Sequence, residues 1–499
     1  MRSAELYDRY KTKMQKIADV KFASAVLQWD QETYLPPKGA AFRGQQIATL
    51  AEIAHQQFIH EDIGNVLNEL SAREDLPNKH KRNVELSLED YTRAIKFTPA
   101  FVRKMSEAVN KGYHDWISAR KANSFGLFST SLAGIVDLKK QEADIIGYSM
   151  HPYDALMNDY DKGLTVEKTD RLFADLQPEL SNLLKHIGEK PQVENKFLQQ
   201  QFDKDKQWAF GIDVLKQMGY DFEAGRQDIS EHPFTINFNN ADVRVTTRID
   251  ENDFGHMLWS CIHEGGHALY EQGLPADEYG LPLSEYCSLS IHESQSRLWE
   301  NCIGRGLAFW KYHFPNLRTI FPDQLKAIST LDFYRGINKV QPSLIRTEAD
   351  ELTYHFHIII RYEIEKRLIE GSLKVKEIPE IWKHMYKQYL GLDVPDDMRG
   401  CLQDIHWSHG SFGYFATYSI GSLYAAQLFA AIELQKPTVS NDIEGGRIDG
   451  VLNWLKQHIF DLGRYYNSEA LCKRATGSEL TSGFFIKYAK NKFSEIYVS

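Results

Sequence analysis

Apolar residues recur with helical spacing along most of this chain, and this periodicity constrains the fold more than any other feature. In residues 172–187 and 354–369 the apolar positions repeat at intervals of three and four, and Gly188 and Gly371 follow as stop signals. Pro178 predicts a kink or a break inside the first of these segments. The length of 499 residues allows about three domains, or one large helical body with a groove through it. We therefore expect a mostly α protein.

One segment departs from the helical pattern. Residues 234–248 alternate β-branched or aromatic residues with others on either side of Asn239 and Asn240, which is a hairpin signal. A small β element is therefore expected just before the next helix. The polar stretch 188–206 predicts a surface connection that need not separate two domains.

The composition excludes several classes of protein. Lys and Arg number 58 and Asp and Glu 68, so the formal charge of −10 argues against a general nucleic-acid or anionic-membrane binder. No apolar stretch approaches the ~20 residues that span a bilayer, and the N-terminus lacks the apolar region of a secretory signal. Five cysteines without a CxxC pair predict reduced thiols. We expect a cytoplasmic protein that contacts neither membrane nor nucleic acid.

Residues 263–267 read HEGGH, a motif of the HExxH type. His263 and His267 stand at positions i and i+4, so that both lie on one helical face and can chelate a single ion. Asn252 or Asp253 can cap the start of this helix, and Gly273 supplies its end. The alternative is an ordinary amphipathic helix with two hydrogen-bonded histidines.

Two adjacent glycines inside the motif need an explanation of their own. Each costs about 1 kcal/mol relative to alanine within a helix. Gly265 and Gly266 therefore indicate that something approaches this turn closely, and a neighbouring strand or a substrate could do so.

A catalytic zinc ion takes three protein ligands and keeps one position open. Glu293 is the candidate for the third ligand, because it lies on a segment, 283–304, that reads as the next helix and can return to the ion. The alternative is a surface carboxylate paired with Arg297 at i+4. His292 points about 100° away from Glu293 around the helix, which favours a supporting or core position over a ligand.

The chain contains six motifs in order: HPF at 232–234, DxRxT at 242–246, HExxH at 263–267, HESQ at 292–295, IRxxAD at 345–350 and GxxQDxHW at 400–407. In these motifs it resembles the carboxypeptidase Taq family of zinc metallopeptidases. One departure is Ala416, which stands where the family pattern FGYFPTY has proline, and it bears only on backbone rigidity there.

The resemblance implies a fold and an activity. It implies one peptidase domain over residues 1–499, similar to neurolysin and angiotensin-converting enzyme. In that fold a deep groove runs between two helical halves, with a short sheet along the zinc site. It also implies a homodimer that removes single residues from the C-termini of peptides.

The same resemblance assigns roles to the motif residues. Zinc, with Co²⁺ or Mn²⁺ as possible substitutes, would be held by His263, His267 and Glu293, and would lower the pKa of a bound water toward ~7. Glu264 follows His263 in the chain but is rotated away from the helical face that His263 and His267 share. This position suits a general base that later delivers the proton to the leaving amine.

Two residues are candidates for stabilising the negative charge that develops on the scissile carbonyl oxygen. His406 and Tyr418 lie 12 residues apart in a glycine-punctuated loop that enters a helix, and they resemble the oxyanion His and Tyr of neurolysin-like enzymes. Tyr414 could take the place of Tyr418, and His409 is the weaker histidine. The alternative for this aromatic-rich loop is simple packing.

An exopeptidase must also hold the free carboxylate of its substrate, and a guanidinium offers a bidentate fork for it. Arg346 fits by motif. An ion pair with Asp350 at i+4 is its ordinary alternative. The competing arginines are Arg244, Arg248 and Arg361. Asp350 and Asp404 are candidates for orienting histidines, with helix capping or ion pairing as equal alternatives.

The substrate can be bound by strand addition, and two other functions compete with that of a carboxypeptidase. The hairpin at 242–246 can pair with an extended peptide, which would give broad specificity. The first rival is an oligoendopeptidase or dipeptidyl carboxypeptidase with the same zinc site. The second is a non-catalytic peptide-binding scaffold with a structural metal, against which Glu264 argues, because a closed structural site needs no general base.

Overall fold

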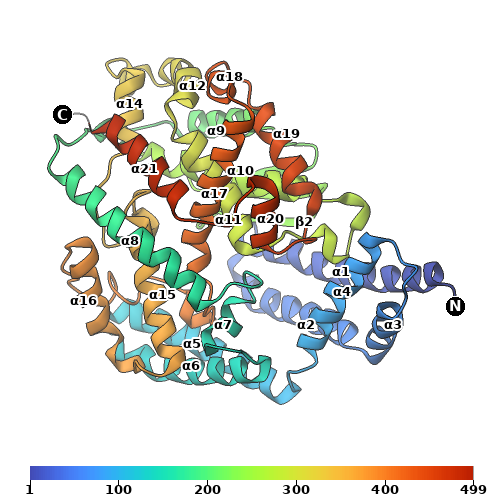
Figure 1. Cartoon of the computed structure of the whole chain (residues 1–499). Helices are drawn as coiled ribbons and strands as arrows, with labels where there is room; N and C mark the ends of the chain where they lie inside the picture. The colour runs from blue at the N-terminus through green and yellow to red at the C-terminus, as the bar shows by residue number, and fades with distance from the viewer. Residues whose placement is uncertain (498–499) are drawn as a thin grey trace. The chain divides into compact units, whose positions relative to one another are not determined.

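The computed structural model describes residues 1–497 of the chain, and helices dominate it, as predicted (Figure 1). The chain divides into two compact units. The first comprises Met1–Ile95, Glu194–Ile337 and Leu428–Glu479, and the second comprises Lys96–Val193, Asn338–Gln427 and the chain from Leu480 onward. Within the described residues no helix has the length and apolar character needed to cross a membrane.

The first unit holds the amino-terminal helices and those around the sheet. Its helices are α1 (Ser3–Thr33), α2 (Ala40–Phe58), α3 (Glu61–Ser71), α4 (Asn78–Ala94), α9 (Lys204–Met218), α10 (Phe254–Gln272), α11 (Leu289–Arg297), α12 (Leu307–Ile320), α13 (Pro322–Leu325), α14 (Thr330–Ile337), α18 (Val439–Glu444), α19 (Asp449–His458) and α20 (Ser468–Thr476).

The second unit is helical within the described part. Its helices are α5 (Pro99–Ala122), α6 (Gly126–Ile146), α7 (Pro152–Met157), α8 (Val166–Gly188), α15 (Tyr354–Glu370), α16 (Ile378–Leu390) and α21 (Gly483–Ile496). Helix α17 (Ala416–Gln435) begins in the second unit and ends in the first. Ala416 is its first residue, a position where proline is also favoured.

The predicted hairpin is present, and a third strand joins it. Strands β2 (Thr235–Asn239) and β3 (Asp242–Thr247) are antiparallel, and β1 (Gly225–Ile229) pairs with the other side of β3 in parallel. Strand β1 was not predicted, because its residues do not alternate in polarity and its partner lies 18 positions later. Gly225 is required there, since a Cβ would stand 2.1 Å from the carbonyl oxygen of Val243.

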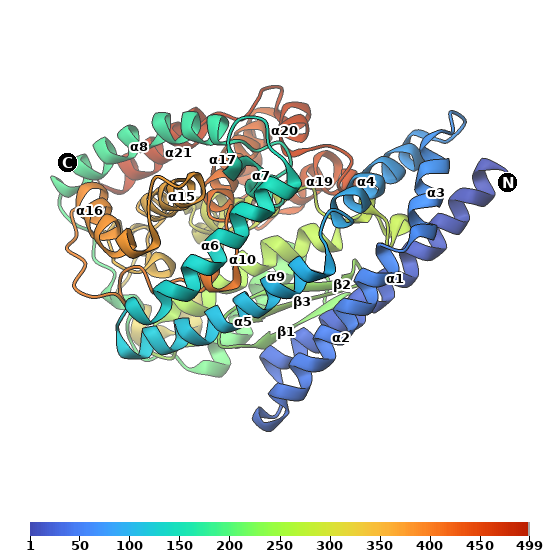
Figure 2. The same ribbon diagram turned by 90° about the horizontal axis from the view of Figure 1, so that it is seen from below.

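The sheet lies between two helices of the first unit, α10 on one face and α1 on the other (Figure 2). On the α10 face, the thiol of Cys261 donates to Gln227 Oε1 of β1 at 3.4 Å. On the α1 face, the Arg244 guanidinium of β3 lies 4.3 Å from the ring centre of Trp29. The first contact fixes the sheet against the helix that carries HExxH, and the second fixes it against α1.

Helix α10 begins and ends as predicted. The side chain of Asp253 caps it by accepting from the amide of Gly255 at 2.8 Å, and Gly273 follows its last residue. The close approach at the paired glycines comes from two helices, not from a strand or a substrate. A Cβ on Gly265 would meet Leu215 of α9 at 2.6 Å, and one on Gly266 would meet the backbone of α11 at 2.8 Å.

The following helix is shorter than predicted. The expected start at residue 283 is six residues too early, because Ser288 caps α11 by accepting from the amide of Ile291 at 3.1 Å. A turn of π-helix, Leu298–Gly304, continues α11. Apolar spacing does not distinguish the 3₁₀ turn at Pro282–Ser284 from the helix that follows it.

The two segments with the clearest periodicity are helical. Helix α8 stays continuous through Pro178, because the buried residues Leu172, Leu176 and Leu180 hold it on both sides of the proline. Helix α15 ends at Gly371, whose φ of +91° suits glycine. All five cysteines are free, and four of them are buried.

Candidate active site

The first unit brings the three predicted ligands together. His263 and His267 project from one face of α10, and Glu293 projects from α11; one donor atom from each lies within 4.8 Å of the other two. The Nε2 atoms of the histidines stand 3.8 and 3.6 Å from Glu293 Oε2. These three residues could hold a metal ion.

Hydrogen bonds orient both imidazoles for this task. His263 Nδ1 lies 2.9 Å from Glu300 Oε2, and His267 Nδ1 lies 3.0 Å from the carbonyl oxygen of His292. Acceptors at Nδ1 place the ring proton there and leave the lone pair of Nε2 facing Glu293. Ligands 2.0–2.2 Å from a tetrahedral zinc ion are separated by about 3.3 Å, close to the distances found here. The donor set therefore fits zinc with one position left open.

Glu300, from the π-helical turn, was not predicted. It lies 3.4 Å from Arg297 and 3.2 Å from Arg305. Burial alone would raise the pKa of Glu300, but the hydrogen bond from His263 and the two arginine charges lower it well below its usual range. Its spacing of seven residues from Glu293 puts it on the same helical side, and that signal could have identified it. Glu300 thus orients His263, one of the candidate ligands.

The carboxylate of Glu293 pairs with Arg297 and also faces the two histidines, so both alternatives predicted for it are seen together. Arg297 Nε donates to Glu293 Oε1 at 2.7 Å, as the ordinary alternative required. Glu293 is buried, however, and its Oε2 faces the two imidazoles. The ion pair therefore orients the candidate ligand.

Glu264 is buried beside strand β2. Thr235 Oγ1 donates to Glu264 Oε2 at 2.7 Å, and Oε1 has no hydrogen-bond partner in the described part of the chain. Burial raises the pKa of Glu264. Thr235 was also missed, although strand alternation places it on one face with Asn237, which bonds Glu271 two turns further along α10.

His292 supports a candidate ligand, consistent with its predicted place behind the ligand set. Its ring stacks on His267 with 4.4 Å between centroids. Its Nε2 lies 2.8 Å from Glu271 Oε1. The chain Asn237, Glu271, His292 thereby links β2 to the back of His267.

His406 and Tyr418 belong to the second unit and lie together there. His406 Nε2 is 3.3 Å from the Tyr418 hydroxyl. Burial, followed by the charge of Arg346, lowers the pKa of His406 to about 3, so the ring is neutral at pH 7. Tyr414 packs against both rings, with centroids 5.4 Å from His406 and 5.1 Å from Tyr418. The pair can offer a neutral imidazole and a phenol as donors.

Arg346 does not pair with Asp350, so that alternative is wrong. Its Nε donates to Asp404 at 2.9 Å and its Nη1 donates to the Tyr354 hydroxyl at 3.2 Å, while Nη2 has no hydrogen-bond partner within residues 1–497. Asp350 instead accepts from the amides of Leu352 and Thr353, both at 2.9 Å, as a capping residue does.

The competing arginines are engaged elsewhere. Arg361 is fully buried and shares Asp404 with Arg346. Arg244 forms two 2.9 Å bonds to Asp242. Arg248 is half exposed, 3.7 Å from Glu231. Of the four, Arg346 and Arg361 are shielded from solvent, and both contact Asp404.

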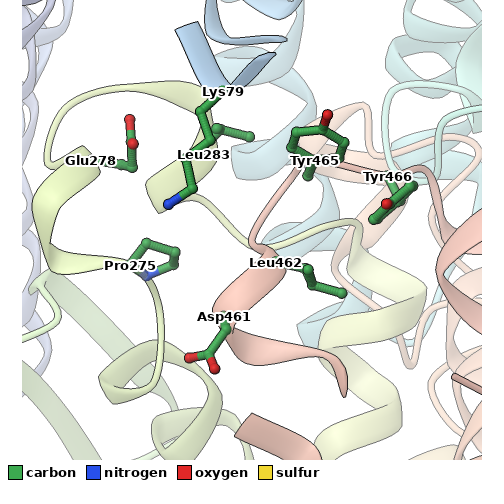
Figure 3. Close-up of a pocket in the computed structure, with 8 residues that line it drawn as sticks. All are labelled: Lys79, Pro275, Glu278, Leu283, Asp461, Leu462, Tyr465 and Tyr466. Carbon is green, nitrogen blue, oxygen red and sulfur yellow. The ribbon is translucent and has the colours of Figure 1, made fainter. Parts of the chain in front are cut away.

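The first unit also contains a cavity of about 150 Å³ (Figure 3). Lys79 extends into it from α4, opposite Pro275 and Asp461. Its other lining residues are Glu278, Leu283, Leu462, Tyr465 and Tyr466. No residue with a predicted role lines this cavity.

Comparison with known proteins decides the family. The family model for carboxypeptidase Taq (M32) metallopeptidases matches residues 9–493. The chain belongs to this M32 family. Carboxypeptidase 1 of Bacillus subtilis (strain 168) is 37% identical over 489 residues, which cover 97% of each chain.

Solved structures agree with this assignment. The M32 carboxypeptidase of Deinococcus radiodurans R1 is 38% identical, with a TM-score of 0.97 over 99% of both chains. The structure of CHT is 56% identical, with a TM-score of 0.97 over 98% of this chain and 99% of that one. This M32 family member is a metallocarboxypeptidase, a hydrolase that acts on peptides.

Proposed function

We propose that this carboxypeptidase uses zinc and releases single C-terminal residues with broad specificity. The observation that carries the proposal is the set of two imidazole Nε2 atoms and one carboxylate within 4.8 Å, beside a buried carboxylate with a free oxygen, Glu264 Oε1. Co²⁺ and Mn²⁺ are the expected substitutes, since imidazole and carboxylate ligands accept both.

The protein groups then have separate tasks. Bound zinc would supply Lewis-acid chemistry, which activates water and polarises the scissile carbonyl. Glu264 Oε1 would accept the proton of the attacking water and pass it to the leaving amine. His406 and Tyr418 would donate to the oxygen on which negative charge develops. The roles of His406 and Tyr418 rest on the resemblance to neurolysin-like enzymes.

We expect each metal ligand to be required for metal binding. His263→Ala and Glu293→Ala should each lose most of their metal when dialysed against dilute zinc, because a site with two protein ligands holds the ion weakly. Elemental analysis measures this. His256→Ala is the matched control, an exposed histidine on the same helix, and it should keep one ion per chain. Full occupancy in either ligand variant would refute the assignment.

The substrate backbone would pair with β2 and not with β3. Strand β3 is bonded on both sides, so a peptide cannot add to the 242–246 segment that the sequence suggested. No further strand of the described chain covers the outer edge of β2. Thr235, which contacts Glu264, lies on this strand. Main-chain pairing there would give affinity without side-chain preference.

Arg346 is proposed to hold the substrate carboxylate. We expect Arg346→Ala, or amidation of the peptide C-terminus, to lower kcat/KM by at least about 10-fold, because each removes a charge-assisted contact. When Arg346→Ala is assayed on the amidated peptide, kcat/KM should fall little further, since both changes remove the same contact. Rates measured on paired free-acid and amide peptides give the test.

Arg361→Lys is the matched control for Arg346. It disturbs the same partner, Asp404, from a fully buried position, so the ratio of free-acid to amide rates should stay near that of the native enzyme. If the amides were cleaved internally as fast as the free acids, the oligoendopeptidase alternative would replace the proposal. If the ratio collapsed only for Arg361→Lys, Arg361 would be the clamp.

Further proposals rest on the resemblance alone. They are one peptidase domain with a groove between helical halves, as in neurolysin and angiotensin-converting enzyme, a homodimer, and a cytoplasmic location without nucleic-acid partners. Sedimentation of the full chain tests the dimer. Mass analysis of short peptides, with and without chelator, distinguishes stepwise C-terminal trimming from removal of dipeptides and from binding without cleavage.

A further inference from the structure

A buried carboxylate in the second unit has no part in the chemistry proposed above. Glu365, on α15, is completely shielded from solvent. Within residues 1–497 no Lys or Arg pairs with it, and the nearby Lys139 is bonded to Glu142 at 2.6 Å. Burial raises the pKa of Glu365 to about 7. Burying such a group is unfavourable unless its hydrogen bonds compensate.

Three donors converge on Glu365 from two segments, α7 and the loop before α17. The Tyr153 hydroxyl of α7 and the amide of Gly413 donate to Oε2 at 2.5 and 2.8 Å. Trp407 Nε1 donates to Oε1 at 2.7 Å. An amide cannot accept at both positions, because it presents a donor at one of them. The arrangement therefore requires a carboxyl group, whose two oxygens can both accept.

Two of these donors belong to the loop that carries the candidate oxyanion residues. Trp407 follows His406 directly, and Gly413 precedes α17, on which Tyr418 lies. Gly413, with φ of +94°, also lies against α7, since a Cβ there would stand 2.7 Å from the backbone of Leu156. One carboxylate thus holds both ends of residues 407–413.

His406 makes few hydrogen bonds of its own, and its ring packs against Phe415 and Tyr414 of the same segment, with centroids 4.4 and 5.4 Å away. Its Nδ1 is buried without a hydrogen-bond partner in the described chain, and its only side-chain bond is the 3.3 Å contact with Tyr418. Its backbone carbonyl is bonded within the same loop, to the amide of Ser411 at 3.0 Å. The position of the imidazole therefore depends on how the loop is held.

We propose that Glu365 is a positioning residue for turnover: by binding Trp407 and Gly413, it fixes His406 and Tyr418 in the geometry that the reaction needs. Glu365 touches no substrate. The inference rests on the proposed roles of His406 and Tyr418.

Glu365→Gln tests this with little change of shape. The amide can keep Tyr153 and Gly413 but turns an N–H toward Trp407 Nε1, which displaces the residue next to His406. We expect kcat to fall roughly 10- to 100-fold, as small misplacements of reacting groups do. KM should stay within about threefold and the metal content unchanged. A native kcat in this variant would overturn the proposal.

Tyr153→Phe is the matched control. It removes a bond to the same carboxylate but leaves both loop contacts, so the melting temperature should fall while kcat stays within about threefold. If Tyr153→Phe lost as much kcat as Glu365→Gln, Glu365 would be merely structural. If Glu365→Gln did not fold, Trp407→Phe would serve, with the same expected kcat loss and the same overturning result.

A combined variant shows whether Glu365 acts through His406 and Tyr418. In a background that carries both His406→Gln and Tyr418→Phe, Glu365→Gln should lower the residual kcat by less than about threefold, because both of its targets are already lost. If the kcat losses multiplied in the combined variant, the inference would be overturned. If His406→Gln and Tyr418→Phe alone left kcat intact, the proposed oxyanion roles would fail instead. The two failures are therefore distinguishable.

Discussion

Glu264→Gln is expected to lose most turnover, with kcat reduced on the order of 10²–10⁴-fold, because it removes the acceptor for the proton of water. The amide is nearly isosteric, and its oxygen can keep the 2.7 Å bond from Thr235. KM, metal content and melting temperature should therefore stay near those of the native enzyme. Steady-state kinetics on a short peptide, together with elemental analysis, measure the effect.

Glu271→Gln is the matched control for this substitution. Glu271 is also buried on α10, two turns beyond Glu264, where it bonds Asn237 and His292. It does not belong to the proposed proton path, so kcat should stay within about 10-fold. A metal-replete Glu264→Gln enzyme with full activity would reject the general base. Equal losses in both variants would attribute the effect to buried charge on α10.

Tyr418→Phe is expected to lower kcat on the order of 10²–10³-fold with little change in KM, since a donor to the developing oxyanion acts mainly in the transition state. The hydroxyl is within hydrogen-bond distance of His406, so its loss also frees that ring. Single-turnover rates at saturating peptide isolate the chemical step.

Tyr414→Phe is the internal comparison. Its ring packs on His406 and Tyr418, and edge-on against Tyr160 at 5.2 Å, so removing its hydroxyl preserves the packing. We expect a much smaller loss of kcat than for Tyr418→Phe. The reverse order would exchange the roles of the two tyrosines, and an effect confined to KM would assign Tyr418 to substrate binding.

Much of the candidate site could be predicted because its signals are local. The i and i+4 spacing fixes His263 and His267 on one face of any helix, and Asp253 and Gly273 mark where that helix begins and ends. Glu293 needed only the assumption that the next helix returns to the first. The motifs then placed Arg346, His406 and Tyr418 in one family pattern; the match over residues 9–493 confirms the family, and the roles of these three residues stay predictions.

Contacts between segments far apart in the chain could not be predicted from the sequence. Thr235 and Glu264 are 29 residues apart, and Arg346 and Asp404 are 58 apart. In the second case local spacing favoured the wrong partner, Asp350. An i+4 acidic residue is a frequent neighbour of arginine on a helix, but Arg346 lies in a 3₁₀ turn before α15, where that spacing no longer applies.

Backbone preferences and side-chain spacing within single segments are enough to specify the helical class, the hairpin, the caps of α10 and the face that carries both histidines. The carboxylates that orient other groups become known only from the folded chain: Glu300 behind His263, Asp404 between Arg346 and Arg361, and Glu365 under the His406 loop. Burial explains the difference. A hydrogen bond or charge gains its strength from the segments that exclude water around it, and those are brought together only by folding.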